Sequence, residues 1–321
     1  MTRNRVALCC AAFLLAFVSN VCAQYNGECW ATDYLNAVKI SGGKASRFSG
    51  FSQPMSISIN AKDGSVWVAD TDAIRVKKLS SAGKVLFVID KGFSTQPMSI
   101  GVDSKNGSCW VATVDSIYKF ASDSKKLLER SGFNEPVLIV NQNNSECWIA
   151  DSNNARIVRL SSDGKQLGVY SVDGVNQPKS ISINHEDNSC WILDPFTQKV
   201  AKLSSDGNVI TQASVSPAGG AIMATSVSAS ADGGCWVAVL VDFVTPNKDL
   251  VMKISTDGKL AKSVSGFHMP STVAYDYKDK GCWVADSNNG RIVKLSAAGQ
   301  KILDIKGFGQ PKAVTVGYIA K

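Results

Sequence analysis

One short phrase recurs seven times along the chain, and it contains every tryptophan of the sequence. Two of its copies read ECWATD and SVWVAD, and the seven centre on Trp30, Trp67, Trp110, Trp148, Trp191, Trp236 and Trp283. The shortest spacing, from Trp30 to Trp67, is 37 residues, and the longest, from Trp236 to Trp283, is 47. This range lies near the period of about 40 to 45 residues that four-stranded propeller blades show. The phrase therefore predicts one repetitive domain, although 321 residues would otherwise suggest two.

Each period contains four short segments with the composition of strands. A run such as QPMSISIN precedes the tryptophan phrase, and a run such as RIVRLSSDG and a weaker stretch such as GKVLFVIDKGF follow it. They are rich in Val, Ile and Ser and are bounded by Gly, Asn, Asp or Pro, which is strand and turn chemistry. We call these strands a, b, c and d from the centre of the predicted ring outward.

The two ends of the chain complete each other. The sequence finishes on QPKAVTVGYIAK, a strand a without its tryptophan phrase, whereas QYNGECWATD near the start is a strand b without its strand a. The expected fold is therefore an all-β, seven-bladed β-propeller of four-stranded antiparallel blades. We expect the C-terminal strand to close the ring by pairing with the N-terminal blade, which leaves only short strand edges.

The first 23 residues have the pattern of a removable export signal, with Arg3 and Arg5 before an uncharged run at residues 6–18. That run is shorter than the roughly 20 apolar residues that span a bilayer, which argues against the alternative of a membrane anchor. A lipid anchor at Cys22 is disfavoured by the bulky Val21 before it. We expect residues 1–23 to be a signal peptide, residues 24–321 to form the propeller, and the mature chain to be periplasmic or extracellular.

The charge of the mature chain is mildly basic. Loss of Arg3 and Arg5 lowers the formal net charge from +7 by two, to +5. Spread over residues 24–321, this charge does not indicate a nucleic-acid partner, and no later segment predicts membrane insertion. We expect a monomer, and an anionic surface or polymer outside the cytoplasm remains open as a partner.

The stretch WIADSNNARIVRLSSDGKQL, together with the GF and P residues that precede many strands a, resembles the NHL-repeat family of β-propellers. The resemblance covers nearly the whole mature chain. It implies the fold and leaves the function open, because members of that family include binding modules, extracellular sensor domains, lactonase-like enzymes and amidating lyases. Many of these relatives have six blades, whereas the tryptophan count here predicts seven.

The repeated residues of strand b are interpreted as scaffold. Seven equivalent tryptophans predict a ring of buried packing anchors. Six cysteines precede a tryptophan, with Val66 in the seventh position, and equivalent strands of packed sheets lie about 10 Å apart, too far for disulfides. We therefore expect six free, buried thiols at Cys29, Cys109, Cys147, Cys190, Cys235 and Cys282.

Two further repeated positions carry charge. Strand c has a cation in every repeat, and its head is expected to reach solvent or an acidic partner while the stem lies along the next blade, or alternatively to join a basic ring for an acidic ligand. Five aspartates follow a tryptophan by three residues, where they are expected to hold the turn after strand b rather than to catalyse. The cations are Lys39, Lys78, Lys119, Arg159, Lys202, Lys253 and Lys294, and the aspartates are Asp33, Asp70, Asp151, Asp194 and Asp286.

A functional site is expected where the repetition fails. The turn after Trp236 is longer than its equivalents, and the connection QASVSPAGGAIMAT that enters the same blade has lost the GF and QP pattern. Both segments should emerge on one face of the ring and form a recognition patch, the alternative being simple drift of loops. The candidate residues of this patch are Phe196, Met223, Asp242, Phe243, Lys248 and His268.

The sequence offers no catalytic motif, no cofactor motif and no metal-ligand spacing. The favoured hypothesis is an exported, non-enzymatic binding scaffold that recognises a protein or glycan partner through the irregular loop face. The alternative is a metal-assisted lyase or a lactonase-like hydrolase at the mouth of the central channel, in which His268 would act with Asp242 or Asp286 and a divalent ion.

Overall fold

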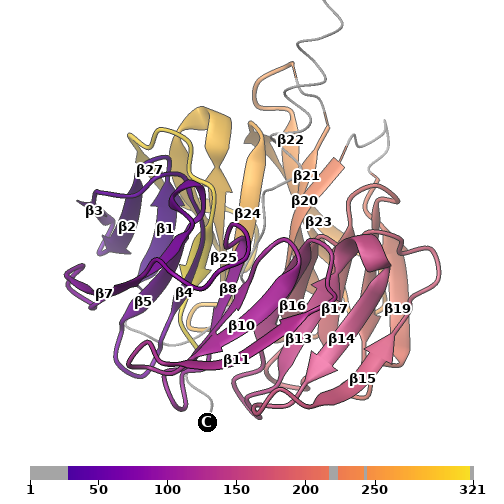
Figure 1. Cartoon of the computed structure of the whole chain (residues 1–321). Coiled ribbons are helices and arrows are strands. Elements are labelled where there is room, and N and C mark those ends of the chain that lie inside the picture. The colour runs from indigo at the N-terminus through magenta and orange to yellow at the C-terminus, as the bar shows by residue number, and fades with distance from the viewer. Residues whose placement is uncertain (1–27, 217–222, 242–243, 319–321) are drawn as a thin grey trace, which may run out of the picture.

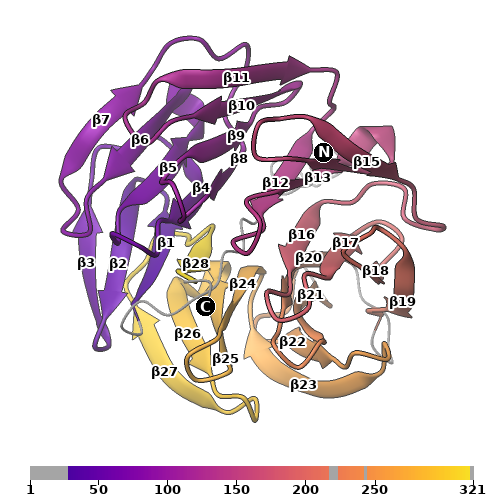
Figure 2. The same cartoon turned by 90° about the horizontal axis from the view of Figure 1, so that it is seen from below.

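Seven four-stranded antiparallel sheets surround a central axis, which confirms the predicted propeller (Figures 1 and 2). The structure is a computed structural model and describes residues 28–216, 223–241 and 244–318. We number the blades 1 to 7 in chain order, and in each blade the strands a to d run from the axis to the rim.

The blades follow one another along the chain. Blade 1 consists of β28 (Val314–Val316), β1 (Cys29–Asp33), β2 (Asn36–Ser41) and β3 (Lys44–Phe48). Blade 2 consists of β4 (Pro54–Ile59), β5 (Val66–Asp70), β6 (Arg75–Leu79) and β7 (Val85–Ile89). Blade 3 consists of β8 (Ser99–Val102), β9 (Cys109–Ala112), β10 (Ser116–Phe120) and β11 (Lys126–Ser131). Blade 4 consists of β12 (Pro136–Val140), β13 (Cys147–Asp151), β14 (Arg156–Leu160) and β15 (Gln166–Tyr170).

Blades 5 to 7 repeat this order. Blade 5 consists of β16 (Ser180–Ile183), β17 (Cys190–Asp194), β18 (Lys199–Leu203) and β19 (Val209–Ser214). Blade 6 consists of β20 (Met223–Ala229), β21 (Cys235–Leu240), β22 (Asp249–Ile254) and β23 (Leu260–Phe267). Blade 7 consists of β24 (Pro270–Asp276), β25 (Gly281–Asp286), β26 (Arg291–Leu295) and β27 (Lys301–Lys306). Three single turns of 3-10 helix follow strands b, namely η1 (Thr71–Ala73), η2 (Ser152–Asn154) and η3 (Ser287–Asn289).

Strand direction divides the connections between two faces. The d-to-a connections and the b-to-c turns lie on the face at the top of Figure 1, which we call the upper face. The a-to-b and c-to-d turns lie on the opposite, lower face, which Figure 2 shows. The C-terminal strand β28 pairs with β1 through Val316 opposite Cys29 and Val314 opposite Ala31, so the ring closes as predicted.

The Cys-Trp pair of strand b fills the space between neighbouring blades. Successive residues of a strand point to opposite faces, so the cysteine and the tryptophan contact different neighbours. Each tryptophan lies in one hydrophobic cluster with the residue that precedes the tryptophan of the next blade. The pairs are Trp30 with Val66, Trp67 with Cys109, Trp110 with Cys147, Trp148 with Cys190, Trp191 with Cys235, Trp236 with Cys282, and Trp283 with Cys29. A small thiol therefore faces each indole across six of the seven blade interfaces.

The serines of strand a bond the next blade. Strand a pairs with strand b only, so its inner edge carries amide groups without a ladder partner. In blade 3 the amides of Ile100 and Val102 donate to Ser56 Oγ (3.2 Å) and Ser58 Oγ (3.1 Å) of blade 2. The same bonds join Leu138 to Ser99, Val227 to Ser180, Ala229 to Ser182, Val273 to Ser226, and Tyr275 to Ser228.

Blade 4 is the apolar exception in this inner layer. Val137 and Ile139 stand at the serine positions and are fully buried. A Cβ at Gly101 of blade 3 would lie 2.8 Å from Leu138 Cδ1, so the glycine provides the space that the larger side chain occupies. The inner layer is thus joined by serine hydrogen bonds in most blades. At the junction of blades 3 and 4, the Leu138 side chain packs into the space beside Gly101.

Removing one serine bond should destabilise the ring. Ser58→Ala leaves the buried Val102 amide unpaired, which should lower the free energy of unfolding by about 1 to 3 kcal/mol in urea titrations. The exposed Ser205→Ala should change it by less than about 0.5 kcal/mol. Equal effects of the two substitutions would contradict the role of the inner-strand serines.

The six described cysteines are free and buried, as predicted. Burial raises the pKa of all six thiols, that of Cys282 to about 12. Because the thiolate is the reactive form, the native mature chain should not react with a thiol reagent at pH 8, whereas the denatured chain should titrate for all of these thiols. Ser205→Cys, which adds an exposed thiol, provides the positive control. A count near zero after denaturation would mean that the cysteines form disulfides.

Candidate functional site

The predicted patch lies on the upper face of blades 5 to 7, and the structure describes four of its six residues. Phe196, in the b-to-c turn of blade 5, is 51% exposed. Lys248 is exposed in the β21–β22 connection, and Met223 is half-buried at the start of β20. His268 is half-buried just before β24. Asp242 and Phe243 lie outside the described residues.

Hydrogen bonds bring Lys248 and His268 into one region. Asp249 is fully buried, and its carboxylate accepts from the amides of Val241 (2.8 Å) and Met269 (2.6 Å). The residue after Lys248 is therefore tied to the residue after His268. On the other side of Lys248, Asn247 accepts from Asn289 Nδ2 of blade 7 at 3.0 Å. The long connection of blade 6 is thus fixed onto blade 7, whereas Phe196 belongs to the blade on the other side.

His268 and Asp286 are neighbours, but their contact does not form a catalytic pair. The backbone amide of His268, and not its imidazole, donates to Asp286 Oδ1 at 2.7 Å. Asp286 Oδ2 accepts from Arg291 Nε (2.6 Å) and Asn289 Nδ2 (2.9 Å), and its side chain is fully buried. A carboxylate whose two oxygens are both bonded in this way holds a turn.

The other aspartates after strand b act in the same way, which confirms the structural interpretation. Asp151 accepts from the Asn134 amide (2.8 Å) in the connection that enters its blade, and from Arg156 Nε (2.6 Å). The guanidinium of Arg156 also donates to the Gly132 carbonyl at 2.9 Å. Each aspartate-arginine pair of this kind therefore holds the d-to-a connection of its own blade. The same set recurs as Asp70, Arg75 and Gly50, and as Asp286, Arg291 and Gly266.

The strand-c cations bridge neighbouring blades in most of the ring. In blades 1 to 4 the head donates to a backbone carbonyl in the c-to-d turn of the next blade, and in blade 5 Lys202 lies 3.4 Å from Thr256 Oγ1. In several blades the cation also lies over the ring of its own tryptophan, as Lys119 does over Trp110 at 4.9 Å. The bonds in blades 1 to 4 join Lys39 to Ser81, Lys78 to Ser122, Lys119 to Ser162, and Arg159 to Ser205. These contacts favour the scaffold interpretation over a basic ring for a ligand.

Blades 6 and 7 depart from this pattern. Lys253 bonds Ser230 Oγ and Asp232 of its own blade, the latter at 2.7 Å, and Lys294 bonds Asp276 and Asp279. In these two blades a glycine precedes the Cys-Trp pair. A Cβ at Gly234 would lie 2.2 Å from the Ile254 carbonyl oxygen and 3.1 Å from Lys253 Nζ. The missing side chain therefore leaves the room in which Lys253 turns back.

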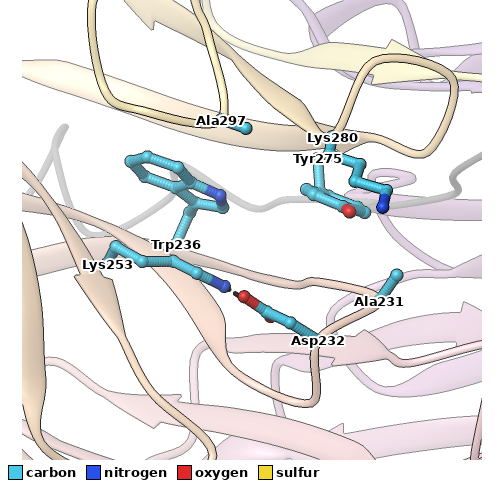
Figure 3. Close-up of a pocket in the computed structure, with 7 residues that line it drawn as sticks. All are labelled: Ala231, Asp232, Trp236, Lys253, Tyr275, Lys280 and Ala297. Carbon is cyan, nitrogen blue, oxygen red and sulfur yellow. Dashed lines mark hydrogen bonds and ion pairs between the residues drawn. The ribbon is translucent and has the colours of Figure 1, made fainter.

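A hollow of about 240 Å³ opens between blades 6 and 7 on the lower face (Figure 3). Its lining consists of Ala231, Asp232, Trp236, Lys253, Tyr275, Lys280 and Ala297, and we call it the blade 6–7 pocket. Figure 3 shows the Lys253–Asp232 ion pair along one side of the hollow, and the Trp236 indole facing Tyr275 and Lys280 across it.

A second group missed by sequence reasoning closes the lower end of the axis. Each blade contributes one residue from just beyond strand a, two positions after its end in six blades and one position after it in blade 7, and we call this set the axial ring. The amides of Ala61, Ser104 and His185 donate to side chains of other members, as in the 2.9 Å bond from His185 to Tyr277 Oη. The members are Ala61, Ser104, Gln142, His185, Ala231, Tyr277 and Tyr318.

His185 is the titratable member of the axial ring that is most buried. Its imidazole stacks on Tyr318 with ring centroids 4.4 Å apart, and neither ring nitrogen has a hydrogen-bond partner among the described residues. Burial alone lowers the pKa of His185 to about 3. The side chain is therefore neutral at physiological pH and packs as an aromatic ring.

Metal-binding groups are not assembled in the part of the chain that the structure describes. Across residues 28–216, 223–241 and 244–318, no group of three or more His, Cys, Asp or Glu side chains could hold an ion. The same ranges contain no helix long and apolar enough to cross a bilayer.

The sequence contains a signal for the turned-back cations of blades 6 and 7, but none for the axial ring. The pairs GGCW and KGCW mark the two blades in which the cation turns back, because glycine replaces the residue before cysteine only there. The axial ring had no such signal, since its members share no residue type.

Comparisons with solved structures place the chain among propellers of diverse function. Virginiamycin B lyase from Staphylococcus aureus is 18% identical and covers 79% of this chain and 84% of its own, with a TM-score of 0.64. A putative 6-phosphogluconolactonase from Bacteroides uniformis is 13% identical over 89% and 98%, with a TM-score of 0.72. A nidogen/laminin complex gives 11% identity over 91% and 99%, with a TM-score of 0.58.

At these identities the similarities show the propeller fold alone, and they do not single out the NHL family within it. No protein-family model and no curated protein matches the chain.

The axial ring generates a pH prediction. The unfolded His185 binds a proton near pH 6.5 and the folded one only near pH 3, so acid favours the unfolded chain. Relative to His185→Phe, which keeps a ring on Tyr318, the wild type should lose stability as the pH falls from 6.5 to 4, at a rate that approaches about 1.4 kcal/mol per pH unit. Urea unfolding at several pH values measures the difference, and parallel curves for the two proteins would exclude a buried neutral imidazole.

Proposed function

We propose that the mature chain is an exported, non-enzymatic binding protein that recognises a protein or glycan partner through the upper face of blade 6 and its neighbours. The observation that carries this proposal is the departure of blade 6 from the repeat. Its β21–β22 connection is longer than its equivalents and holds Val244 with 83% of the side chain exposed, beside the exposed Lys248. An apolar side chain so exposed on a loop suits contact with a partner.

The repeated polar groups support a scaffold without catalysis. Serines of strand a bond the next blade, aspartates after strand b hold the entering connection, and most strand-c cations bridge blades. The lyase alternative requires His268 and an acid such as Asp286, whose oxygens are already bonded to backbone and arginine. The Asp286 carboxylate is thus already engaged in holding the turn, which disfavours it as the acid of such a lyase.

The fixing of the connection supports recognition rather than drift of a loop. Asp249 and Asn247 bond blade 7 on both sides of Lys248, so this part of the connection is held in one conformation. A surface that is ordered before the partner binds loses less conformational entropy on binding than a flexible surface does. The predicted signal at residues 1–23 would place this face outside the cytoplasm, where protein and glycan partners are accessible.

A charge placed at Val244 should weaken partner binding. Immobilised mature chain should capture a partner from the native extracellular or periplasmic fraction, and Val244→Asp should reduce the captured amount at least about tenfold, because a buried unpaired carboxylate is costly at an interface. Leu127→Asp, on the 54% exposed Leu127 of the outer strand β11, is the matched control.

Two results would contradict the proposal. Equal capture by the wild type and Val244→Asp would exclude this patch. A stoichiometric divalent ion in elemental analysis, lost together with a lyase or lactonase activity in His268→Ala, would establish the enzymatic alternative.

A further inference from the structure

The blade 6–7 pocket lies on the lower face, opposite the upper face of blade 6, and its origin is a local change in the repeat. In blades 1 to 4 a strand-c cation crosses to the c-to-d turn of the next blade and fills the space between them. Lys253 instead turns back to Asp232 beside Gly234, and Ala297 occupies the turn position of blade 7 that carries Ser or Thr in blades 2 to 6. Both changes remove atoms from the same junction.

The lining combines an apolar floor with surplus positive charge. Trp236, Ala231 and Ala297 provide apolar surface, and Tyr275 adds an aromatic ring. Lys253 is neutralised by Asp232 at 2.7 Å. Lys280 is exposed and makes no hydrogen bond or ion pair with any residue in the described ranges. The pocket therefore holds one cation that no carboxylate neutralises.

The frame of the pocket is rigid on the side that faces the axis. Tyr275 is buried, its amide donates to Ser228 Oγ at 2.9 Å, and its ring packs edge-on against Tyr277 at 4.8 Å. On the other side, Asp232 accepts from Ser230 Oγ (2.6 Å) and the Gly234 amide (3.1 Å). Ligand binding would therefore immobilise little more than the Lys280 side chain.

We infer that the blade 6–7 pocket binds a small organic monocarboxylate, with the carboxylate at Lys280 and an apolar or aromatic body against Trp236 and Ala297. The volume of about 240 Å³ corresponds to about eight water molecules at roughly 30 Å³ each, which suits a ligand of the size of benzoate. A single surplus positive charge matches a single carboxylate. This site is separate from the upper-face patch, and its test does not depend on the identity of the macromolecular partner.

The test uses benzoate as the probe and the mature chain as the protein. Titration of the 15N-labelled chain at low ionic strength should give saturable shifts at the amides of Gly233, Gly234 and Ala297, with a dissociation constant of order millimolar. Lys280→Gln should weaken binding about three- to fivefold, as expected for the loss of a solvent-exposed ion pair. Binding should also weaken at high salt, because salt screens exposed charges.

Matched controls distinguish the pocket from unspecific attraction. Lys278→Gln removes another exposed lysine of the same turn, one that does not line the pocket, and it should leave the affinity unchanged. Benzamide, the neutral analogue, should bind clearly more weakly than benzoate, and Ala297→Leu should block both by filling the hollow. Absence of saturation by about 20 mM benzoate would overturn the inference, as would equal effects of the two lysine substitutions or equal binding of benzamide.

Discussion

The open inner edge of each blade is the constraint on which this ring depends. Strand a pairs on one side only, and a row of unpaired amides at the axis would be costly, since a buried unsatisfied donor loses about 1 to 3 kcal/mol. The chain meets this constraint with the serines of the preceding blade, as at Ser58 and Val102. Because each bond joins one blade to the next, satisfying the edges also fixes the order and spacing of the blades.

The interface between blades explains why the repeat contains a Cys-Trp pair rather than tryptophan alone. Successive side chains of a strand point to opposite faces, so the indole faces the next blade and the thiol faces the previous one. A large and a small residue therefore meet at every junction. Trp30 meets Val66 at the seventh, which shows that size and not sulfur chemistry is required there. The repeated residues are thus used to hold the blades together. Functional positions are therefore expected where the repeat is broken, namely in the long connection of blade 6 and at Lys253, which bonds Asp232 of its own blade.

The sequence predicted the parts of the molecule that repeat. The spacing of the tryptophans, from Trp30 to Trp283, was sufficient for seven blades, and the unmatched QPKAVTV segment was sufficient for closure by β28. His185, Tyr277 and Tyr318 could not be grouped, because their contact arises only when strands far apart in the chain converge on the axis. The pocket was missed for a different reason: Gly234 and Ala297 are visible as departures from the repeat, but only the structure shows that their small side chains meet at one junction and leave a hollow there.

The two unpredicted features share one wall. The ring of Tyr275 lines the pocket and packs on Tyr277, which in turn packs on Tyr318 of the C-terminal segment at 5.2 Å. Closure of the propeller by its last strand therefore also positions one side of the pocket, at a distance of more than forty residues in sequence. Lys280 stands outside this packed group on an exposed turn, so its charge can be removed without disturbing the frame. A loss of ligand affinity in Lys280→Gln consequently reports on electrostatic attraction and not on the integrity of the ring.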